Sequence, residues 1–162
     1  MNISKVLIVS DSHARPSNVL AAVRKEKPFD LLVHLGDVQG STEEIEREAG
    51  CPCYFVRGNC DYDDNLPSFT VFYLGANKVY AAHGHRHHVN YGTENLEMSA
   101  KENGCCIAMY GHTHVPDIRV KKDLLLLNPG SISLPRQSGF DKTYIVLTMD
   151  EKGKPVPKLR KL

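Results

Sequence analysis

The sequence predicts an α/β fold in which two mixed β-sheets form a sandwich with helices outside. In the first third of the chain, short apolar runs alternate with helix-like segments, which is typical of parallel strands joined by right-handed crossovers. The rest of the chain consists mostly of strands, several of them joined by short turns. The 162 residues are enough for one domain, residues 1–162, with a buried core.

The first third is predicted to contain three strands with a helix after each of the first two. The apolar runs that predict the strands are residues 5–10, 31–36 and 53–58. A helix over residues 17–25 is indicated by a capping serine and apolar residues on one face. A second helix over residues 41–49 is indicated by Ser41 and Glu44, which form a capping-box pattern, and by Gly50 as a stop.

The remaining elements are predicted from turn signals and apolar alternation. They are a hairpin over residues 71–82, a helix over 93–102, a second hairpin over 118–127 and a last strand over 143–149. The tail, residues 152–162, is basic and interrupted by proline. Such a composition is typical of a solvated chain end.

Five of the apolar runs end in residues that can bind a metal. The motifs are Asp11-Ser12-His13, Gly36-Asp37, Gly58-Asn59-Cys60-Asp61, His83-Gly84-His85 and Gly111-His112-Thr113-His114. Any one of them alone would be interpreted as a turn or a cap. Their recurrence favours a metal site on one rim of the sheets. Asp11 and His13 are two residues apart, as are His112 and His114, so in extended backbone each pair would point to one face.

With these motifs in this order over about residues 5 to 131, the chain resembles the calcineurin-like metallophosphoesterase superfamily. More narrowly, it is similar to the small prokaryotic phosphodiesterase subgroup, whose closing loop resembles Asn128-Pro129-Gly130-Ser131. The resemblance implies one domain with a four-layer αββα fold, in which two mixed sheets pack face to face between helices. It also implies a dinuclear metal centre at the strand ends.

The resemblance assigns the ligands of both metals. One ion would be held by Asp11, His13, Asp37 and His114, and the other by Asp37, Asn59, His83 and His112. One carboxylate can bridge two ions about 3.5–4 Å apart, and Asp37 is the natural bridge. These donors suit Mn²⁺, Fe²⁺, Ni²⁺, Co²⁺ or Zn²⁺, with Mn²⁺ as the first choice from the resemblance. Asn59 is also expected to contact the substrate.

The predicted function is that of a hydrolase, a metal-dependent phosphodiesterase. The two ions would lower the pKa of a bridging water and hold the resulting hydroxide in line with the leaving oxygen. Many members of the superfamily have His at the position of Cys60 and use it near the leaving group. A thiol is a weak hydrogen-bond donor and a poor replacement for the imidazole. Cys60 is therefore the ordinary residue of the subgroup, or it only packs beside the metals, or a nearby histidine acts near the leaving group in its place. His85 is the best placed of these histidines. Cys60 and His85 are therefore the candidate catalytic residues.

His34 belongs to a predicted strand rather than to its end. It points opposite to Val33 and Leu35 along that strand, which favours a buried, hydrogen-bonded histidine over a ligand.

Composition limits the partners of the protein. The formal charge of +1 provides no global field for nucleic acid or a membrane surface. No apolar run approaches the length of a membrane span, and the first one stops at Asp11, so a cytoplasmic location is expected.

The five cysteines lack the paired spacing of structural zinc sites and are expected to be mostly reduced. The expected partner is a small phosphodiester, and the resemblance is consistent with a homodimer.

Two alternative functions stay open. The first is a non-catalytic protein-interaction scaffold, because a subunit of the eukaryotic retromer complex resembles this subgroup and works as a scaffold. Against it, all seven matched ligands are present. The second is a nuclease guided by Lys121, Lys122 and the basic tail, which the near-neutral charge disfavours.

Overall fold

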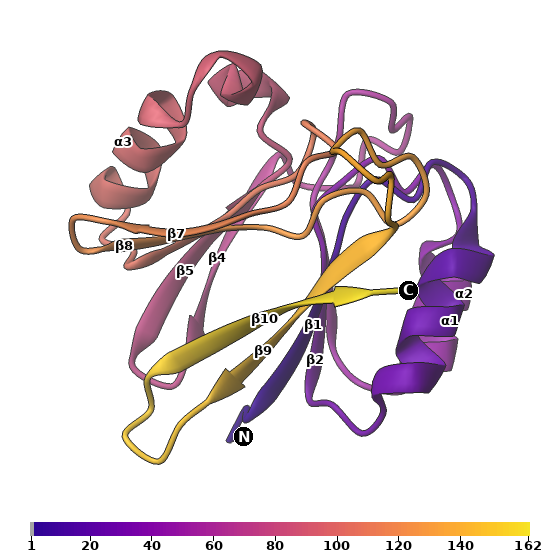
Figure 1. The fold of residues 1–162 in the computed structure, drawn as a ribbon, viewed down its shortest axis with the longest axis horizontal. Coiled ribbons are helices and arrows are strands. Elements are labelled where there is room, and N and C mark those ends of the chain that lie inside the picture. Colours follow the sequence, from indigo (N-terminus) through magenta and orange to yellow (C-terminus); the bar gives the residue numbers. More distant parts are fainter. Residues whose placement is uncertain (1) are drawn as a thin grey trace.

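Two five-stranded β-sheets pack face to face in the computed structural model, which describes residues 2–162 (Figure 1). The strand orders are β10-β9-β1-β2-β3 and β4-β5-β6-β8-β7. Helices α1 and α2 lie against the outer face of the first sheet, and α3 lies against the outer face of the second (Figure 1). The predicted four-layer αββα sandwich is therefore confirmed.

The first sheet contains both ends of the described chain. Its strands are β1 (Lys5–Val9), β2 (Leu31–His34), β3 (Cys53–Phe55), β9 (Thr143–Met149) and β10 (Pro155–Lys161). Strands β1, β2 and β3 are parallel, and α1 (Pro16–Glu26) and α2 (Thr42–Ala49) connect them in turn. The alternation predicted for the first third is confirmed, and the carboxyl ends of the three strands lie on one rim.

The second sheet is built from two hairpins and one further strand. Its strands are β4 (Phe69–Leu74), β5 (Asn77–Ala82), β6 (Ile107–Met109), β7 (Asp117–Lys121) and β8 (Leu124–Asn128). Strands β5, β6 and β8 are parallel, so their carboxyl ends also share a rim. Two 3-10 turns, η1 (His85–His87) and η2 (Val89–Tyr91), and helix α3 (Glu94–Glu102) join β5 to β6.

Alternating side chains of the central strands fill separate layers of the core. In β1, Val6 and Ile8 face the second sheet, whereas Leu7 and Val9 face the helices. All four are completely buried. Because burying such a side chain contributes about 1.5–3 kcal/mol, the two-sided burial of β1 fixes the strand that leads to the first motif.

The tail forms a strand that the sequence did not predict, although most of its residues are exposed, as expected of a solvated end. Residues 155–161 pair with β9 over its whole length. Pro155 and Pro157 are two residues apart, so both direct their missing N–H to the same side. Since β10 is an edge strand, that side faces away from β9 and no ladder hydrogen bond is lost.

The predicted stop of α2 is confirmed, whereas its predicted N-terminal cap is not formed. Gly50 adopts the left-handed conformation, with a φ of 65°, and closes the helix as predicted by donating its N–H to Glu46 O at 3.0 Å. Ser41 also has a positive φ, 79°, and its side chain caps nothing. The predicted capping box is therefore not formed, because the turn that enters the helix holds Ser41 in a left-handed conformation.

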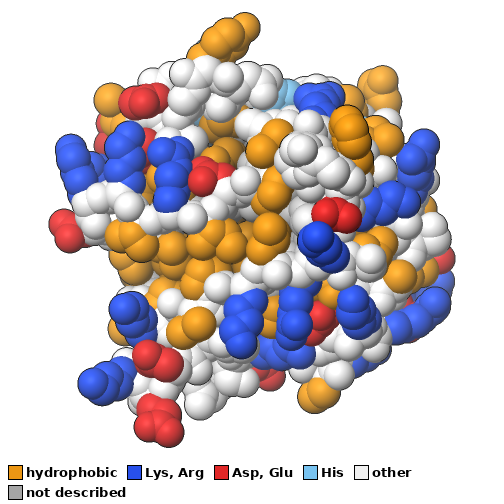
Figure 2. Space-filling model, viewed as in Figure 1, with side chains coloured by type: hydrophobic (Ala, Val, Ile, Leu, Met, Phe, Trp, Pro, Cys, Tyr) orange, Lys and Arg blue, Asp and Glu red, His pale blue; other side chains and the backbone are white. Residues whose placement is uncertain are grey.

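Hydrophobic side chains gather at one open edge of the sandwich. Figure 2 shows them between the β7–β8 hairpin and the β9–β10 hairpin, with lysines and arginines on both sides. On the faces of the two edge strands that point toward the other sheet, the exposed apolar residues are Ile118 and Val120 of β7 and Leu159 of β10. Within residues 2–162, every helix is too short or too polar to cross a bilayer.

Candidate metal centre

The seven predicted ligands meet on the rim where parallel strands of both sheets end. Asp11 and His13 follow β1, Asp37 follows β2 and Asn59 follows β3, whereas His83 follows β5 and both His112 and His114 follow β6. Residues as far apart in the sequence as Asp11 and His114 are thereby within contact distance. The structure brings together every residue of the predicted set.

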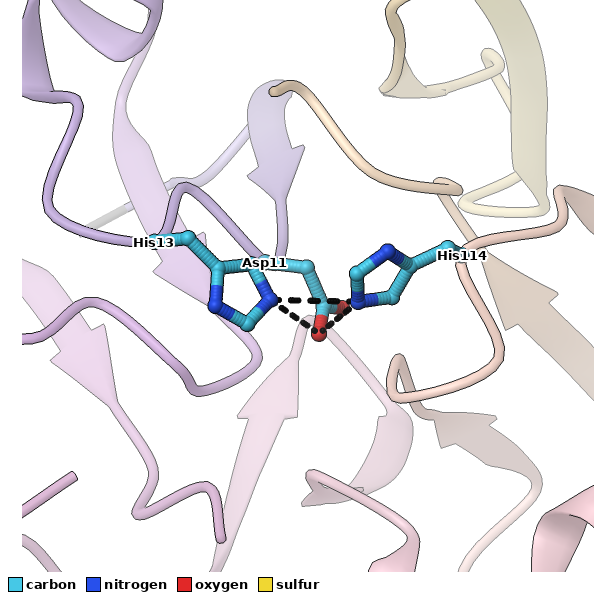
Figure 3. A group of neighbouring side chains, drawn as sticks. All are labelled: Asp11, His13 and His114. Carbon is cyan, nitrogen blue, oxygen red and sulfur yellow. Dashed lines mark hydrogen bonds and ion pairs between the residues drawn. The ribbon is translucent and has the colours of Figure 1, made fainter. Parts of the chain in front are cut away.

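Two buried carboxylates lie at the middle of this cluster. Asp11 Oδ1 is 3.1 Å from His114 Nε2 and 3.6 Å from His13 Nε2, and Figure 3 shows the three side chains pointing toward one another. Asp37 Oδ2 is 3.2 Å from His83 Nε2 and 3.7 Å from His13 Nε2. Asp37 therefore lies between imidazoles of both expected ligand groups, as a bridging carboxylate would.

The other two ligands join the cluster at His83. The Nδ1 atom of His112 is 3.3 Å from His83 Nε2, and Asn59 Oδ1 is 3.1 Å from the same atom. Three groups of donor atoms lie within 4.8 Å of one another: Asp11 with His13 and His114, Asp11 with Asp37 and His83, and His13 with Asp37 and Cys60. The overlap of these groups fits two adjacent ions.

Three of the imidazoles are held by a hydrogen bond on the nitrogen that faces away from the cluster. The acceptors of the Nδ1 hydrogens are Gln39 Oε1 for His13 at 2.9 Å, Leu35 O for His83 at 2.6 Å and Leu134 O for His114 at 2.6 Å. Because Nδ1 is the donor, Nε2 is left to act as a metal ligand. This arrangement is the usual support for metal-binding histidines.

The backbone turns sharply at most of the predicted ligands. Positive φ angles occur at Asp11 (55°), His13 (48°), Asp37 (54°), His112 (69°) and His114 (59°). The prediction that each pair of ligands lies in extended backbone is therefore wrong, because the strands end before the ligands begin. Non-glycine residues in this region carry strain, which is characteristic of functional sites.

Two glycines of the motifs are required by close approach of the carboxylates. A Cβ on Gly58 would collide with the side chain and backbone nitrogen of Asp37. A Cβ on Gly111 would collide with Ser10 Oγ and with Asp11 Oδ2. Gly58 is thus required by the Asp37 carboxylate, and Gly111 by the Ser10 hydroxyl together with the Asp11 carboxylate.

Asp61 organises the loops around Asp37, a role that sequence reasoning missed. Its carboxylate accepts hydrogen bonds from the backbone N–H groups of Asp37 at 2.8 Å, Gln39 at 2.7 Å and Gly58 at 2.8 Å. Asp61 is buried. The only signal in the sequence is its place at the end of the Gly58-Asn59-Cys60-Asp61 motif.

The loop after β8 ties the two sheets together behind the ligands. Asn128 Nδ2 donates to Gly111 O at 3.2 Å and to Thr113 Oγ1 at 3.0 Å. Ser131 Oγ donates to Asp11 O at 2.8 Å. The segment that resembles the closing loop of the subgroup therefore supports a ligand motif from each sheet.

The charges of the cluster favour a cation. Burial alone raises the pKa of Asp11, but the imidazoles of His114, His13 and His83 outweigh it and hold the pKa well below its usual range. Burial likewise raises the pKa of Asp37, and His83 more than offsets it. Burial lowers the pKa of His83, but Asp37 and Asp11 raise it to about 9. Both carboxylates are thus ionised at neutral pH.

The donor set fits divalent metal ions. Asp11 Oδ1 is buried and accepts no hydrogen bond of good geometry from residues 2–162. A buried charged oxygen without such a partner is costly unless a cation neutralises it. Oxygen and imidazole donors without thiolates in the matched positions are those of Mn²⁺, Fe²⁺, Co²⁺, Ni²⁺ or Zn²⁺ sites.

The two candidate catalytic residues lie on different sides of the cluster. Cys60 borders His13 and Asp37, and its backbone N–H donates to Asp37 Oδ1 at 2.8 Å. Burial and Asp37 raise the pKa of the Cys60 thiol. The ring of His85 is 5.4 Å from that of His83, and burial with the nearby His83 lowers the His85 pKa to about 4. At neutral pH both side chains are therefore uncharged.

His34 is the buried, hydrogen-bonded histidine that the sequence predicts. Its Nδ1 accepts the N–H of Gly36 at 3.2 Å, so its Nε2 carries the hydrogen and donates to Ser12 Oγ at 2.9 Å. The side chain is completely buried and belongs to none of the three groups of donor atoms.

Two packed mixed sheets with aspartates and histidines on a shared rim define a metallophosphoesterase fold. The chain belongs to the calcineurin-like phosphoesterase superfamily, whose domain model matches residues 5–152. It is 34% identical over 146 residues to the probable metallophosphoesterase YsnB of Bacillus subtilis (strain 168), covering 90% of this chain and 84% of YsnB. It is 32% identical over 103 residues to phosphodiesterase YfcE of Escherichia coli (strain K12), covering 59% of this chain and 52% of YfcE.

Solved structures share the fold over almost the whole chain. A conserved protein of Streptococcus pneumoniae TIGR4, a predicted phosphoesterase, superposes with a TM-score of 0.82 at 26% identity and covers 99% of both chains. Vps29 from Entamoeba histolytica, solved in complex with Zn²⁺, superposes with a TM-score of 0.76 at 20% identity, covering 97% of this chain and 98% of Vps29. At that identity the second likeness shows the fold alone.

Proposed function

We propose that this phosphoesterase is a metal-dependent phosphodiesterase that uses two divalent ions. The observation that carries the proposal is the convergence of seven donor side chains, three of them imidazoles whose Nδ1 hydrogen bonds leave Nε2 facing two buried carboxylates. The similarity to YfcE, which is named a phosphodiesterase, supports diesters as the substrates.

The proposed ligand sets are those that the family resemblance assigns. One ion would be held by Asp11, His13, Asp37 and His114, and the other by Asp37, Asn59, His83 and His112. When bound, the ions supply Lewis-acid chemistry, lowering the pKa of a water and offsetting the negative charge of the phosphate. Mn²⁺ is the first choice, and Ni²⁺, Zn²⁺, Fe²⁺ and Co²⁺ are the alternatives.

The side chains around the ligands have separate tasks in this proposal. Asp11 and Asp37 are ionised and would repel a phosphate in the absence of a cation. Asn59 is exposed at the rim, so its amide can contact a phosphate oxygen while it faces His83. Cys60 and His85 remain the candidates for contact with the leaving group, one on each side of the cluster.

Hydrolysis of an activated diester tests the proposal. Chelator-stripped protein is titrated with Mn²⁺, Ni²⁺, Zn²⁺ and Mg²⁺ while release of p-nitrophenol from bis(p-nitrophenyl) phosphate and from p-nitrophenyl phosphate is followed. We expect metal to restore activity, mainly on the diester. The Asp37→Ala variant should lose both hydrolysis and metal binding, because Asp37 contacts imidazoles of both ligand groups.

Asp64→Ala is the matched control, because the Asp64 side chain is 89% exposed and pairs only with Arg57 among the ion pairs of residues 2–162. It should retain both properties. Full activity of metal-loaded Asp37→Ala would contradict the assignment of the ligands. Two bound metals with no hydrolysis of any ester would contradict the enzymatic function.

That last outcome would favour the alternative, a non-catalytic protein-interaction scaffold. The observation on its side is the apolar surface between the edge strands (Figure 2). On the edge strand β7, Val120 is 75% exposed. The retention of a complete donor set supports the enzyme instead, because binding a partner requires no such set. The cytoplasmic location and the homodimer stay predictions.

A further inference from the structure

A cavity of about 430 Å³ lies beside the metal centre. Its walls are Ala14, Gln39, Gly40, Tyr62 and Asp63. Binding sites for small organic molecules usually occupy about 300–1,000 Å³, so this cavity has room for a ring system rather than only for water.

The cavity is joined to the cluster of ligands by hydrogen bonds and chain continuity. Gln39 in its wall accepts the Nδ1 hydrogen of His13 at 2.9 Å. Ala14 directly follows His13, and Tyr62 is two residues after Cys60, whose backbone N–H contacts Asp37. The cavity therefore borders the corner of the centre formed by His13, Asp37 and Cys60. A phosphodiester carries two ester substituents, and one that extended toward this corner would reach the cavity.

The walls expose flat and small groups to an occupant. The Tyr62 side chain is 90% exposed, so a face of its ring is free to stack. Two other wall residues are small: Ala14 offers a methyl group, and a Cβ placed on Gly40 would meet no atom within 4 Å. Aromatic side chains at the edge of a groove bind planar rings by stacking, with little dependence on which ring is bound.

The polar groups of the walls select against a negatively charged substituent. Neither lysine nor arginine lines the cavity, and Asp63 adds a negative charge. Asp63 Oδ1 accepts the N–H of Asn65 at 2.9 Å, which holds the carboxylate in place and leaves Oδ2 for a hydroxyl donor. A second phosphate would be repelled, whereas a neutral group with a planar ring and hydroxyls would be accepted.

We propose that this cavity is a specificity site for a nucleoside-type substituent of the diester, with the base stacked on Tyr62 and a sugar hydroxyl bound to Asp63. The inference rests on the proposed phosphodiesterase function and deepens it. It narrows the substrates to diesters in which one alcohol is a neutral nucleoside, and it disfavours diesters whose substituent carries a further phosphate.

The test compares two substrates that release the same p-nitrophenol. One is the p-nitrophenyl ester of thymidine 5′-monophosphate, and the other is methyl p-nitrophenyl phosphate. The quantity measured is the preference, which is the ratio of their kcat/KM values with the Mn²⁺-loaded protein. The Tyr62→Ser variant should lower this ratio by about fivefold or more, chiefly through KM for the nucleoside substrate. Tyr62→Phe should retain it, because the ring is kept.

Tyr73→Ser is the matched control. Tyr73 is 60% exposed and belongs to β4, away from the cavity walls, so its loss should leave the preference as it is. A ratio that is equal in Tyr62→Ser and Tyr73→Ser would overturn the proposal. A proportional loss on both substrates in Tyr62→Ser would also overturn it, because the role of the ring would then be structural.

Failure of the proposed function is a separate outcome. It would appear as no hydrolysis of either substrate by the wild-type protein with any metal. The cavity is then tested by nuclear magnetic resonance titration of the Mn²⁺-free protein with thymidine. Shifts of the Gly40 and Tyr62 amide signals that vanish in Tyr62→Ser would support a nucleoside site, and unshifted signals would overturn it.

Discussion

His34 illustrates how one buried histidine differs from the histidines that surround the metal centre. Its ring accepts a hydrogen bond from Gly36 N–H and donates one to Ser12 Oγ, so both nitrogens are satisfied only in the neutral form. Burial is the main reason that the pKa of His34 falls from 6.5 to about 4. By contrast, His83 has a raised pKa because Asp37 lies 3.2 Å from its Nε2.

Because the folded protein holds His34 in its neutral form, we expect acid to lower the free energy of unfolding. The pKa of His34 is about 4 in the folded protein, whereas the ordinary value is 6.5. The stabilisation that neutral His34 gives the folded state is therefore complete above pH 6.5 and is lost as the pH falls toward 4. The free energy of unfolding should drop by about 3 kcal/mol over this window through His34 alone. Urea denaturation of chelator-stripped protein at pH 7, 6, 5 and 4 measures the drop.

The His34→Asn variant provides the comparison. An amide oxygen can still accept the Gly36 N–H, but it does not titrate in this range. Its free energy of unfolding should therefore fall less steeply with acid than that of the wild-type protein. Parallel curves for the two proteins would show that His34 does not cause the sensitivity.

At the scale of elements, the loops after β2 and β3 depend on one carboxylate. Asp61 accepts three backbone N–H groups, two from the loop after β2 and one from the loop after β3. It thereby fixes the turn that holds Asp37 in a left-handed conformation. Each buried N–H left without an acceptor costs about 1–3 kcal/mol.

Replacement of Asp61 should damage both stability and metal binding. We expect Asp61→Ala to lower the free energy of unfolding by about 3 kcal/mol or more, and to weaken metal affinity by about 10- to 100-fold, as loss of a group supporting a ligand usually does. Denaturation by urea and metal titration calorimetry measure the two effects. Asp64→Ala, an exposed change in the same loop, should alter stability by less than about 0.5 kcal/mol. Equal results for the two variants would remove Asp61 from its assigned role.

The elements predicted from the sequence are those with local signals. Apolar runs and turn residues are sufficient for β1, α3 and the two hairpins, because their patterns depend on neighbouring residues. Strand β10 pairs with the neighbouring strand β9, but two prolines and several charged residues interrupt its apolar pattern, so the sequence carries no strand signal there. The role of Asp61 depends on partners far along the chain, because Asp61 contacts N–H groups up to 24 residues away. The ligands themselves were recognised from their motifs, but their left-handed turns carry no pattern that separates them from an extended backbone.

At the scale of the whole molecule, the metal centre is the place where the two sheets are linked by charge. Four of the predicted ligands follow strands of the first sheet: Asp11, His13, Asp37 and Asn59. The other three, His83, His112 and His114, follow strands of the second. Between the sheets the core contacts are apolar, from side chains such as Ile8 and Met109. Ions bound at the rim would therefore connect the sheets at the end where Asp11 and Asp37 are buried.

This linkage predicts that metal stabilises the folded protein, whether or not it hydrolyses a diester. A ligand at 100 times its dissociation constant stabilises the folded state by about 2.7 kcal/mol, and 1 kcal/mol shifts the melting temperature of a domain of this size by about 2–4 °C. Saturating Mn²⁺ should thus raise the melting temperature of chelator-stripped protein by about 5–10 °C in scanning calorimetry. In Asp37→Ala the rise should disappear, because that side chain contacts imidazoles from both sheets. An equal rise in both proteins would mean that the ions bind elsewhere and that the rim does not join the sheets.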